Sequence, residues 1–344
     1  MPKSEIRNSK FEILLRISVA IPVRNEEQSI GQLLDCLQNQ TLAPAEILVT
    51  DGGSTDRTAQ IIEEHNHGPI PVRLIRAGQA LPGRGRNLAA AQAENEWVAF
   101  VDAGVRPEPT WLESLAKRAQ GTTDVDVVYG NYEPVTDTLF KLCAVMTYVA
   151  PPSEIDGKLV RPRSIASALM KRSVWQSVGG FPEDLRSAED LVFMNRIDSA
   201  CHRVTTAPEA LVHWQVQPTM WRTFRRFIEY ARSNMRAGLW RQWQAAIFKR
   251  YGFLLIIALT AIMLGSRWLV VPLLLWLALL VARALVAIRR NRVCYPAGVL
   301  QIIIRAIVMV PILAMLDVAT IIGTVQWALG DRLYVSKHSE SISQ

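Results

Sequence analysis

The sequence predicts an α/β domain with a mostly parallel central sheet, followed by an all-α transmembrane region. Between residues 17 and 213, short β-branched runs alternate with amphipathic stretches, as in sheets covered by helices on both faces. The later part is so apolar that 50% of all residues are hydrophobic and the mean hydropathy is +0.14. A soluble enzyme of 344 residues is rarely this hydrophobic, which indicates that part of the chain lies in lipid.

Strands and helices alternate along the predicted α/β domain. We expect strands at residues 17–22, 46–50, 72–75, 97–101, 125–129, 165–170 and 204–213. We expect helices at residues 29–40, in a stretch ending near 65, and at 84–93, 111–119, 138–149, 171–178 and 189–200. Ligands bind at the carboxyl ends of the strands in such sheets, and Asp51 and Asp102 fall at two of these ends.

The last third of the chain predicts interfacial and membrane helices. Residues 220–250 are basic and aromatic, which favours one or two amphipathic helices at a membrane interface; packing on the α/β domain is the alternative. Apolar stretches follow at residues 251–265, 268–288 and 306–329. A span needs about 20 apolar residues, so the first stretch is short for one.

Two charged residues interrupt the apolar region. Residues 302–311 carry Arg305, so this segment is predicted either as part of a span or as interfacial or re-entrant. Asp317 lies inside the third stretch, where a carboxylate requires a partner in the helix bundle or a functional role.

Charge is distributed unevenly along the chain. Residues 222–292 contain 13 Lys and Arg and one Glu, a local balance of +12 in a chain with a net charge of +7. Basic residues that flank apolar helices indicate the cytoplasmic face of a membrane with anionic lipids. Residues 289–292 are therefore expected in the cytoplasm, with the first two spans forming a hairpin. Nucleic-acid binding is disfavoured, because the basic residues form no stripe on a soluble fold.

These features divide the chain into five segments. We expect an N-terminal tail at residues 1–16, the α/β domain at 17–218, basic amphipathic interfacial helices at 219–250, about three transmembrane helices at 251–330 and a C-terminal tail at 331–344. The first tail lacks the apolar core of a signal peptide, so we expect a multi-pass membrane protein whose α/β domain is cytoplasmic. The four cysteines form no CxxC motif, as in a reducing compartment.

Three acidic positions have both a functional and a structural interpretation. Asp51 precedes glycines and either accepts hydrogen bonds from a nucleotide or forms an Asx turn. Asp102 either holds a divalent cation against a diphosphate or serves as a turn residue. Glu189 and Asp190 open a helix, where they are either dipole-matched caps or include a general base.

The order and spacing of six motifs decide between these interpretations. The motifs are Ile-Pro-Val-Arg-Asn-Glu at 21–26, Asp-Gly-Gly-Ser-Thr-Asp at 51–56, Gly-Arg-Asn at 85–87, Val-Asp-Ala-Gly at 101–104, Gly-Gly-Phe-Pro at 179–182 and Ala-Glu-Asp at 188–190. Together they resemble the family-2 glycosyltransferases, which have a GT-A fold, over about residues 17–240. The resemblance implies an inverting enzyme that transfers a sugar in one displacement, with a nucleoside diphosphate as the leaving group.

The resemblance also implies roles for single residues. The implied donor-binding residues are Pro22 and Glu26 at the nucleotide, Asp51 at the base or ribose, Arg86 at the base or a phosphate, and Asp102 as the first Asp of the DxD motif. Asp190 is the implied catalytic base, with Glu189 beside it. An in-line displacement needs a base opposite the leaving group and positive charge on the diphosphate.

Two positions depart from the family pattern. Gly52 stands where the family usually has a second Asp, and Gly104 replaces the last Asp of DxD, which usually binds the metal. His213 matches a position where some members place a metal-ligating histidine. We therefore predict Asp102 and His213 as ligands of Mn²⁺ or Mg²⁺, with a structural histidine as the alternative. Mn²⁺ suits a mixed oxygen and imidazole shell better.

An arginine-rich segment follows the implied catalytic base. Many relatives carry here a helix whose arginines reach the donor diphosphate, which arginine grips bidentately. Among Arg225, Arg226 and Arg232, we predict Arg225 and Arg232 as donor-binding residues, with lipid headgroups as the alternative. The processive signature Gln-x-x-Arg-Trp is reduced to Gln217 and Trp221, which favours transfer of a single sugar over polymer extrusion.

The sequence therefore predicts a membrane-anchored, hexosyltransferase-type enzyme of the cell envelope or of glycolipid synthesis. Its expected partners are a nucleotide-sugar donor, a lipid or lipid-linked acceptor and the membrane. Two other classes remain open. One is a catalytically idle, nucleotide-sugar-binding scaffold, which Gly52 and Gly104 suggest. The other is a nucleotidyltransferase of related fold, which would release pyrophosphate.

Overall fold

The computed structural model describes residues 15–155 and 157–331. Its strands are β1 (Ile17–Val23), β2 (Glu46–Asp51), β3 (Val72–Arg76), β4 (Trp97–Phe100), β5 (Val105–Pro107), β6 (Val127–Val135), β7 (Ser153–Ile155), β8 (Lys158–Val160), β9 (Ala168–Lys171) and β10 (Val204–Gln215). Its α-helices are α1 (Ile30–Gln38), α2 (Thr58–Glu64), α3 (Pro82–Gln92), α4 (Trp111–Gly121), α5 (Leu139–Tyr148), α6 (Arg172–Ser177), α7 (Glu189–Ser199), α8 (Met220–Arg236), α9 (Trp240–Trp243), α10 (Ala245–Leu264), α11 (Val270–Arg290) and α12 (Val299–Gln326).

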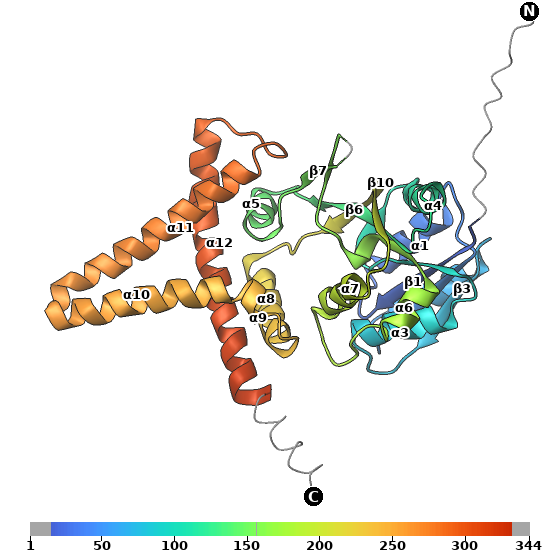
Figure 1. The fold of residues 1–344 in the computed structure, drawn as a ribbon, viewed down its shortest axis with the longest axis horizontal. Coiled ribbons are helices and arrows are strands. Elements are labelled where there is room, and N and C mark those ends of the chain that lie inside the picture. The colour runs from blue at the N-terminus through green and yellow to red at the C-terminus, as the bar shows by residue number, and fades with distance from the viewer. Residues whose placement is uncertain (1–14, 156, 332–344) are drawn as a thin grey trace, which may run out of the picture.

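A mixed eight-stranded sheet forms the centre of the first domain, in the order β3-β2-β1-β4-β9-β6-β10-β5. The strands β3, β2, β1 and β4 are parallel to one another, with Ile21 opposite Val49 and Ala20 opposite Phe100. The other half is mixed, because β9 runs antiparallel to both β4 and β6 while β10 runs parallel to β6. The predicted α/β fold is confirmed, and its parallel part is the half nearest the N-terminus (Figure 1).

Helices cover both faces of the sheet because successive strand residues point to opposite sides. Val19 and Ile21 pack in one core with α1, α2 and α4, whereas Ala20 packs in another with α3, α6 and α7. The helix α1 is an example of how apolar spacing determines a helix. Its apolar residues recur at helical spacing, and all four are fully buried on one face, namely Ile30, Leu33, Leu34 and Leu37.

Several short elements were not predicted from the sequence. The strand β5 has three residues, and β7 and β8 form a small separate hairpin. Segments this short carry no readable periodicity, and β5 exists only because β10 pairs with it. The predicted strand at 165–170 begins instead as a 3₁₀ turn (Ile165–Ser167) before β9.

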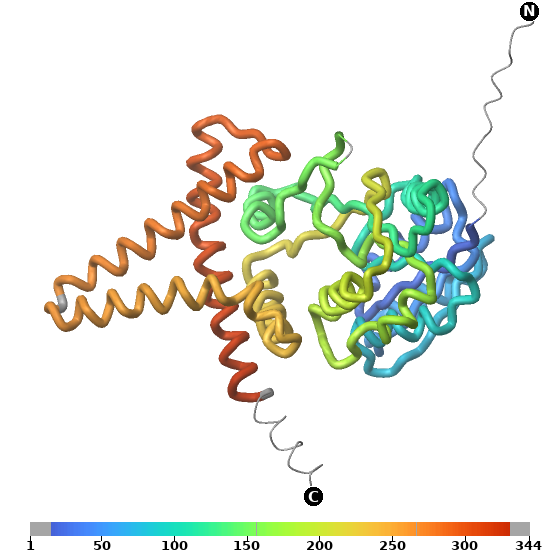
Figure 2. Tube along the Cα trace, viewed as in Figure 1, coloured from blue at the N-terminus to red at the C-terminus, as the bar shows by residue number. Residues whose placement is uncertain are grey.

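The C-terminal helices lie at one end of the α/β domain, away from β3 (Figures 1 and 2). The helices α10 and α11 form a hairpin, and α8 packs against α12. The two helices approach closely at Gly323, where a Cβ atom would overlap the carbonyl oxygen of Ile228. Three helices in the described part are long and apolar enough to cross a membrane, at residues 245–264, 267–290 and 299–330.

Two details of the apolar region differ from the prediction. The helix α10 begins at Ala245, so the first apolar stretch is not short but part of a 20-residue helix. The helix α12 is continuous through Pro311, so residues 302–311 form no separate re-entrant segment. Arg305 reaches back to the loop before α12, where its guanidinium donates to the carbonyl oxygens of Tyr295 and Pro296 at 2.7 and 3.3 Å.

The short apolar helix α5 connects the α/β domain to this region. Its residues Cys143 and Met146 lie in one apolar cluster with Leu280 of α11 and Met309 of α12. Burial raises the pKa of the Cys143 thiol to about 11, so this cysteine packs as an apolar group.

Candidate active site

The loops that follow β1 and β2 are hydrogen-bonded to each other at the carboxyl edge of the sheet. Asn25 adopts a left-handed conformation, and its side-chain oxygen accepts the backbone N–H of Thr55 at 2.8 Å. Its own N–H donates to Ser54 Oγ at 2.9 Å. The N–H of Glu26 donates to Thr58 Oγ1 at 2.8 Å. These hydrogen bonds hold the two loops together beside the predicted donor residues.

Three predicted donor-binding residues lie together at this edge. Pro22 is opposite Thr50 in the β1–β2 register. Asp51 is buried, and its Oδ1 accepts the N–H and the hydroxyl of Ser54 at 3.0 and 2.5 Å, as in an Asx turn. The Glu26 carboxylate accepts the Ser29 hydroxyl at 2.6 Å. These contacts show a structural use of Asp51 and Glu26, and their contact with a donor stays a prediction.

Gly52 and Gly104, the two departures from the family pattern, differ in the space available for a side chain. A Cβ atom at Gly52 would lie 2.5 Å from the carbonyl oxygen of Ala80, so the segment before α3 excludes a side chain there. Gly53 has a φ of +82° and meets the carbonyl of Gly78 in the same way. At Gly104, by contrast, no atom lies within 4 Å of the added Cβ. The missing carboxylate of DxD is therefore not a consequence of crowding.

Arg86 joins two of the predicted site residues. Its Nη1 lies 2.7 Å from Glu189 Oε1, 103 residues away, and its Nη2 lies 2.6 Å from Asp102 Oδ1. The Arg86 side chain is 5% exposed, whereas that of Asp102 is 41% exposed. Burial lowers the pKa of Arg86, but Asp102, Glu189 and Asp190 together raise it above its ordinary value. The guanidinium is thus permanently charged and is surrounded by carboxylates.

Asp190 interacts with the same buried guanidinium as the two other carboxylates. Burial raises the pKa of the Asp190 carboxyl group, and neither Arg86 nor the hydrogen bond from the N–H of Leu191 offsets that effect. Asp102 raises it further. Burial likewise raises the pKa of Glu189 despite its ion pair with Arg86. A carboxylate with a raised pKa is a better proton acceptor near neutral pH.

The backbone before α7 is strained at the point where it presents these carboxylates. Ala188 has a φ of +69°, in the left-handed region that a residue with a Cβ seldom adopts. Such strain is often found at functional sites. It turns the chain so that both Glu189 and Asp190 begin the helix beside Arg86.

Asn87 fixes the segment that leads to α7. Its side-chain amide donates to the carbonyl of Phe181, and its oxygen accepts from Phe181 N–H and Trp175 Nε1, all at 2.9 Å. The ring of Phe181 lies under Arg86 and stacks on Phe193 of α7 with centroids 3.8 Å apart. Asn87 is a positioning residue that the sequence analysis did not single out, although the Gly-Arg-Asn motif contains it.

The helix α8 carries Arg226, which the sequence names beside Arg225 and Arg232. Arg226 donates from Nε to the Tyr230 hydroxyl at 3.0 Å. Tyr230, and then the carboxylates of Asp102 and Glu189, raise the pKa of Arg226. Arg225 and Arg226 are both exposed and Arg232 is half-buried; Arg225 and Arg232 stay predicted donor contacts. The i, i+4 spacing of Arg226 and Tyr230 is the signal that would have identified Arg226.

His213 does not contact Asp102 in this structure. It lies on β10 opposite Arg106 of β5, and its Nε2 is 2.5 Å from Glu108 Oε1. Among residues 15–155 and 157–331, no three or more His, Cys, Asp or Glu side chains converge to hold a metal ion. A metal held by Asp102 and His213 stays a prediction.

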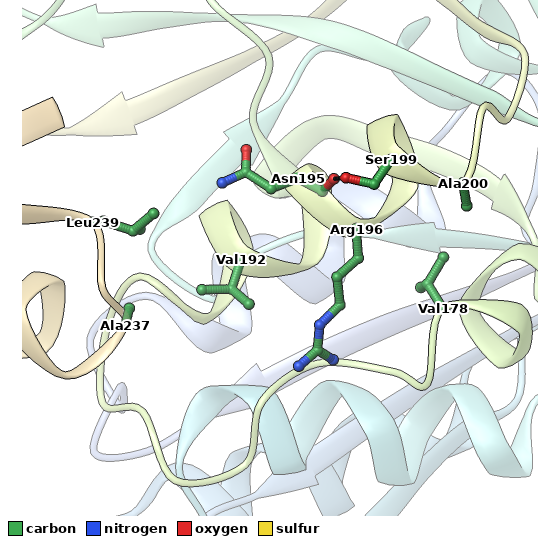
Figure 3. Close-up of a pocket in the computed structure, with 8 residues that line it drawn as sticks. All are labelled: Val178, Val192, Asn195, Arg196, Ser199, Ala200, Ala237 and Leu239. Atoms are coloured by element: carbon green, nitrogen blue, oxygen red, sulfur yellow. Dashed lines mark hydrogen bonds between the residues drawn. The ribbon is translucent and has the colours of Figure 1, made fainter. Parts of the chain in front are cut away.

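A cavity of about 480 Å³ lies on another side of α7, between this helix and the α8–α9 turn (Figure 3). Its lining includes Asn195, Arg196 and Ser199 of α7 and Leu239 before α9. Arg196 donates to the carbonyl of Gly180 at 3.1 Å, so it also supports the segment before α7. None of the predicted site residues lines this cavity.

The fold and this carboxylate–guanidinium edge define a GT-A α/β domain of the glycosyltransferase class. Residues 18–159 match the family described as glycosyl transferase family 2. The chain therefore carries a glycosyl transferase family 2 domain, as the sequence motifs predict.

Comparisons with individual proteins agree with this assignment. The chain is 26% identical over 216 residues to poly(ribitol-phosphate) β-N-acetylglucosaminyltransferase TarS of Staphylococcus aureus, covering 58% of this chain and 35% of TarS. It is 29% identical over 201 residues to glycosyltransferase AglE of Haloferax volcanii, covering 57% of this chain and 65% of AglE. The similarity thus spans between about a third and two thirds of these relatives.

A solved structure supports the fold over nearly the whole chain. It is mannosyltransferase PcManGT from Pyrobaculum calidifontis in complex with GDP-Man and Mn²⁺. The TM-score is 0.53 at 22% sequence identity, and the match covers 89% of this chain and 87% of that chain. The GT-A fold is confirmed by this similarity.

Proposed function

We propose that this protein is an inverting glycosyltransferase. It transfers a single sugar from a nucleoside diphosphate sugar to a lipid or lipid-linked acceptor. The observation that carries the proposal is the buried Arg86, which holds Asp102 and Glu189 together beside Asp190 at the carboxyl edge of the sheet. The family match of residues 18–159 and the nucleotide-sugar in the PcManGT complex support a donor of this class.

Each residue of this edge has a proposed role. Asp190 removes the proton of the acceptor, because its pKa is raised and it begins a helix next to the cation. Glu189 holds Arg86 in place. Arg86 and Arg226 stabilise the negative charge that develops on the leaving diphosphate. Asp102 orients the donor, with Pro22, Glu26 and Asp51 along the nucleotide. Arg225 and Arg232 remain proposed as further donor contacts.

A divalent cation is the one cofactor in the proposal. Asp102 and His213 are the residues proposed to hold it. However, one oxygen of Asp102 is paired with Arg86, His213 is bonded to Glu108, and Gly104 offers no carboxylate. The residues do not fit a metal ion without rearrangement, so no step is assigned to one.

The three long apolar helices support a location in a membrane. We propose a multi-pass protein with its α/β domain in the cytoplasm, because basic residues cluster beside the apolar helices. A membrane location favours an acceptor that is a lipid or is attached to one.

The identity of the released product tests this function. The purified protein is incubated with a panel of UDP- and GDP-sugars and a lipid extract, and the release of nucleoside diphosphate and of pyrophosphate is measured. Acceptor-dependent release of a nucleoside diphosphate from one donor is the expected result. Release of pyrophosphate would establish a nucleotidyltransferase instead. Donor binding without any turnover would establish the idle scaffold.

A further inference from the structure

A group of polar side chains joins the three apolar helices, and we call it the Asp317 cluster. Asp317 of α12 is 1% exposed and receives both Nη atoms of Arg283 of α11, at 2.5 and 3.0 Å. Arg250 Nη1 lies 3.4 Å from the same carboxylate, and the Tyr251 hydroxyl donates to it at 3.1 Å. The indole N–H of Trp276 donates in turn to the Tyr251 oxygen at 3.2 Å.

The cluster carries one more positive charge than negative charges. Two guanidinium groups share one carboxylate, which leaves a surplus of +1. An arginine has five N–H donors, and within the described chain the two arginines use three of their ten on Asp317. Their side chains remain 27% and 22% exposed for Arg283 and Arg250, whereas the carboxylate is enclosed. The remaining donors therefore point outward.

The two helices that carry these donors expose mainly apolar side chains. They include Phe253, Leu255, Ile256, Leu273, Leu274 and Leu277. Unpaired N–H donors and an uncompensated charge are costly in such surroundings. An anion with several oxygen acceptors would satisfy both.

The cluster lies near the base of the hairpin and not at its tip. Arg250 is the sixth residue of α10, and Arg283 is seven residues, or two turns, before the end of α11 at Arg290. Figure 1 shows the hairpin projecting away from the α/β domain, with α12 beside its base. If the hairpin crosses the membrane proposed above, this position corresponds to the headgroup level of the leaflet that faces the α/β domain. Tyr251 and Trp276 are of the residue types that are enriched at that level.

We propose that Arg250 and Arg283 bind the phosphate group of an anionic membrane lipid. Guanidinium forks match phosphate oxygens bidentately, and basic pockets between membrane helices on the cytoplasmic side bind anionic headgroups. Asp317 holds the two forks in place and keeps the site from carrying two uncompensated charges. The inference rests on the membrane location proposed above, but not on the transferase chemistry.

Lipid binding by the full chain in detergent tests the proposal. Native mass spectrometry compares retention of phosphatidylglycerol with that of zwitterionic phosphatidylcholine. We expect the wild type to prefer phosphatidylglycerol. Arg250→Gln and Arg283→Gln should each weaken this binding by about tenfold or more, since each removes charge-assisted hydrogen bonds.

Arg267→Gln is the matched control, because Arg267 is an exposed arginine at the opposite end of the same hairpin, over the ring of Trp268. Its binding should equal that of the wild type. Equal weakening by Arg267→Gln, or no preference for phosphatidylglycerol in the wild type, would overturn the proposal. If Arg283→Gln does not fold, Arg250→Gln decides, because its contact with Asp317 is the longer one.

A second titration distinguishes two sources of the phosphate. Undecaprenyl phosphate that displaces phosphatidylglycerol from the wild type, but binds Arg250→Gln weakly, would make the site one for a lipid phosphate monoester. Undecaprenyl phosphate that leaves phosphatidylglycerol in place would make it a site for bulk headgroups. Either result is independent of nucleoside diphosphate release, so a failure of the proposed enzymatic function would not alter it.

Discussion

Two buried charge clusters of this protein have opposite compositions. At the carboxyl edge of the sheet, the buried cation Arg86 faces Asp102, Glu189 and Asp190, and the exposed Arg226 is the second cation that interacts with these acids. Among the apolar helices, the single carboxylate Asp317 faces two arginines. The first cluster has too little positive charge for its acids, so a carboxylate is held with a raised pKa and can act as a base. The second has too little negative charge, so it has capacity for an anion.

Among the variants proposed, the loss of the Arg86 charge should lower the free energy of unfolding most. Arg86→Met leaves Glu189 buried without its cation, which should lower the free energy of unfolding by about 3–5 kcal/mol and abolish transfer. Denaturant unfolding of the detergent-solubilised protein measures the loss. Arg84→Met, an exposed arginine on the same helix, is the control and should unfold like the wild type. A similar loss in both variants would contradict the central role of Arg86.

The equivalent change in the second cluster should be milder. Arg283→Met leaves Asp317 with Arg250 and Tyr251, so its carboxylate is not stranded. We expect a loss of about 1–3 kcal/mol, less than for Arg86→Met. The comparison of the two unfolding midpoints under one condition measures the difference. A larger loss for Arg283→Met would show that Arg250 does not compensate and that the surplus charge is only apparent.

The contact between α8 and α12 joins the α/β domain to the apolar helices and can be tested by itself. Gly323→Ala inserts a methyl group against the Ile228 carbonyl and should separate α8 from α12, at a cost of about 1–3 kcal/mol. It should also lower activity, since α8 carries Arg226. Gly252→Ala, on exposed α10 with no atom within 4 Å of the new methyl group, should change neither property. Unfolding midpoints and donor turnover of the two variants provide the test.

The pH dependence of the first cluster should have opposite signs for activity and stability. Asp190 acts as a base only when deprotonated, so turnover should rise with pH, with a midpoint above the ordinary aspartate value of about 3.9. A raised pKa in the folded state means that its contribution to stability is present below the ordinary pKa and is lost as pH rises through the raised value. A pH profile of kcat/KM measures the first effect. A midpoint at or below 3.9 would contradict the account.

The smallest expected effect concerns the strained residue before α7. Ala188→Gly relieves the left-handed conformation and should raise the free energy of unfolding by about 1 kcal/mol. If the strain serves only to place Asp190, turnover should stay close to that of the wild type. A destabilised variant would show that the methyl group of Ala188, which is buried, contributes more than the strain costs.

The comparison also shows which features the sequence can predict. Periodicity placed β1 and α1 to within two residues, because their apolar faces are buried in one core. Motif spacing placed Asp102 and Asp190 in one site, although the fold had to bring them together through Arg86. The strand β5 is too short to show a pattern and depends on β10.

Features that depend on helix docking were not predictable. The docking of α8 on α12 depends on a close approach at Gly323, which lies far along the chain from Ile228. The sequence indicated that Asp317 needs a partner, but Arg283 lies 34 residues away, and only the packing of α11 against α12 brings the two together. The steric exclusion of a side chain at Gly52 likewise depends on a loop distant in sequence.

One measurement tests the central claim most directly. Nucleoside diphosphate release is compared for the wild type, Asp190→Asn and Asp184→Asn; Asp184 is an exposed aspartate six residues earlier on the same segment. The account predicts that Asp190→Asn lowers kcat by about 10²–10⁴-fold with donor binding retained, while Asp184→Asn matches the wild type. Turnover by Asp190→Asn within twofold of the wild type would contradict the assignment of Asp190 as the base.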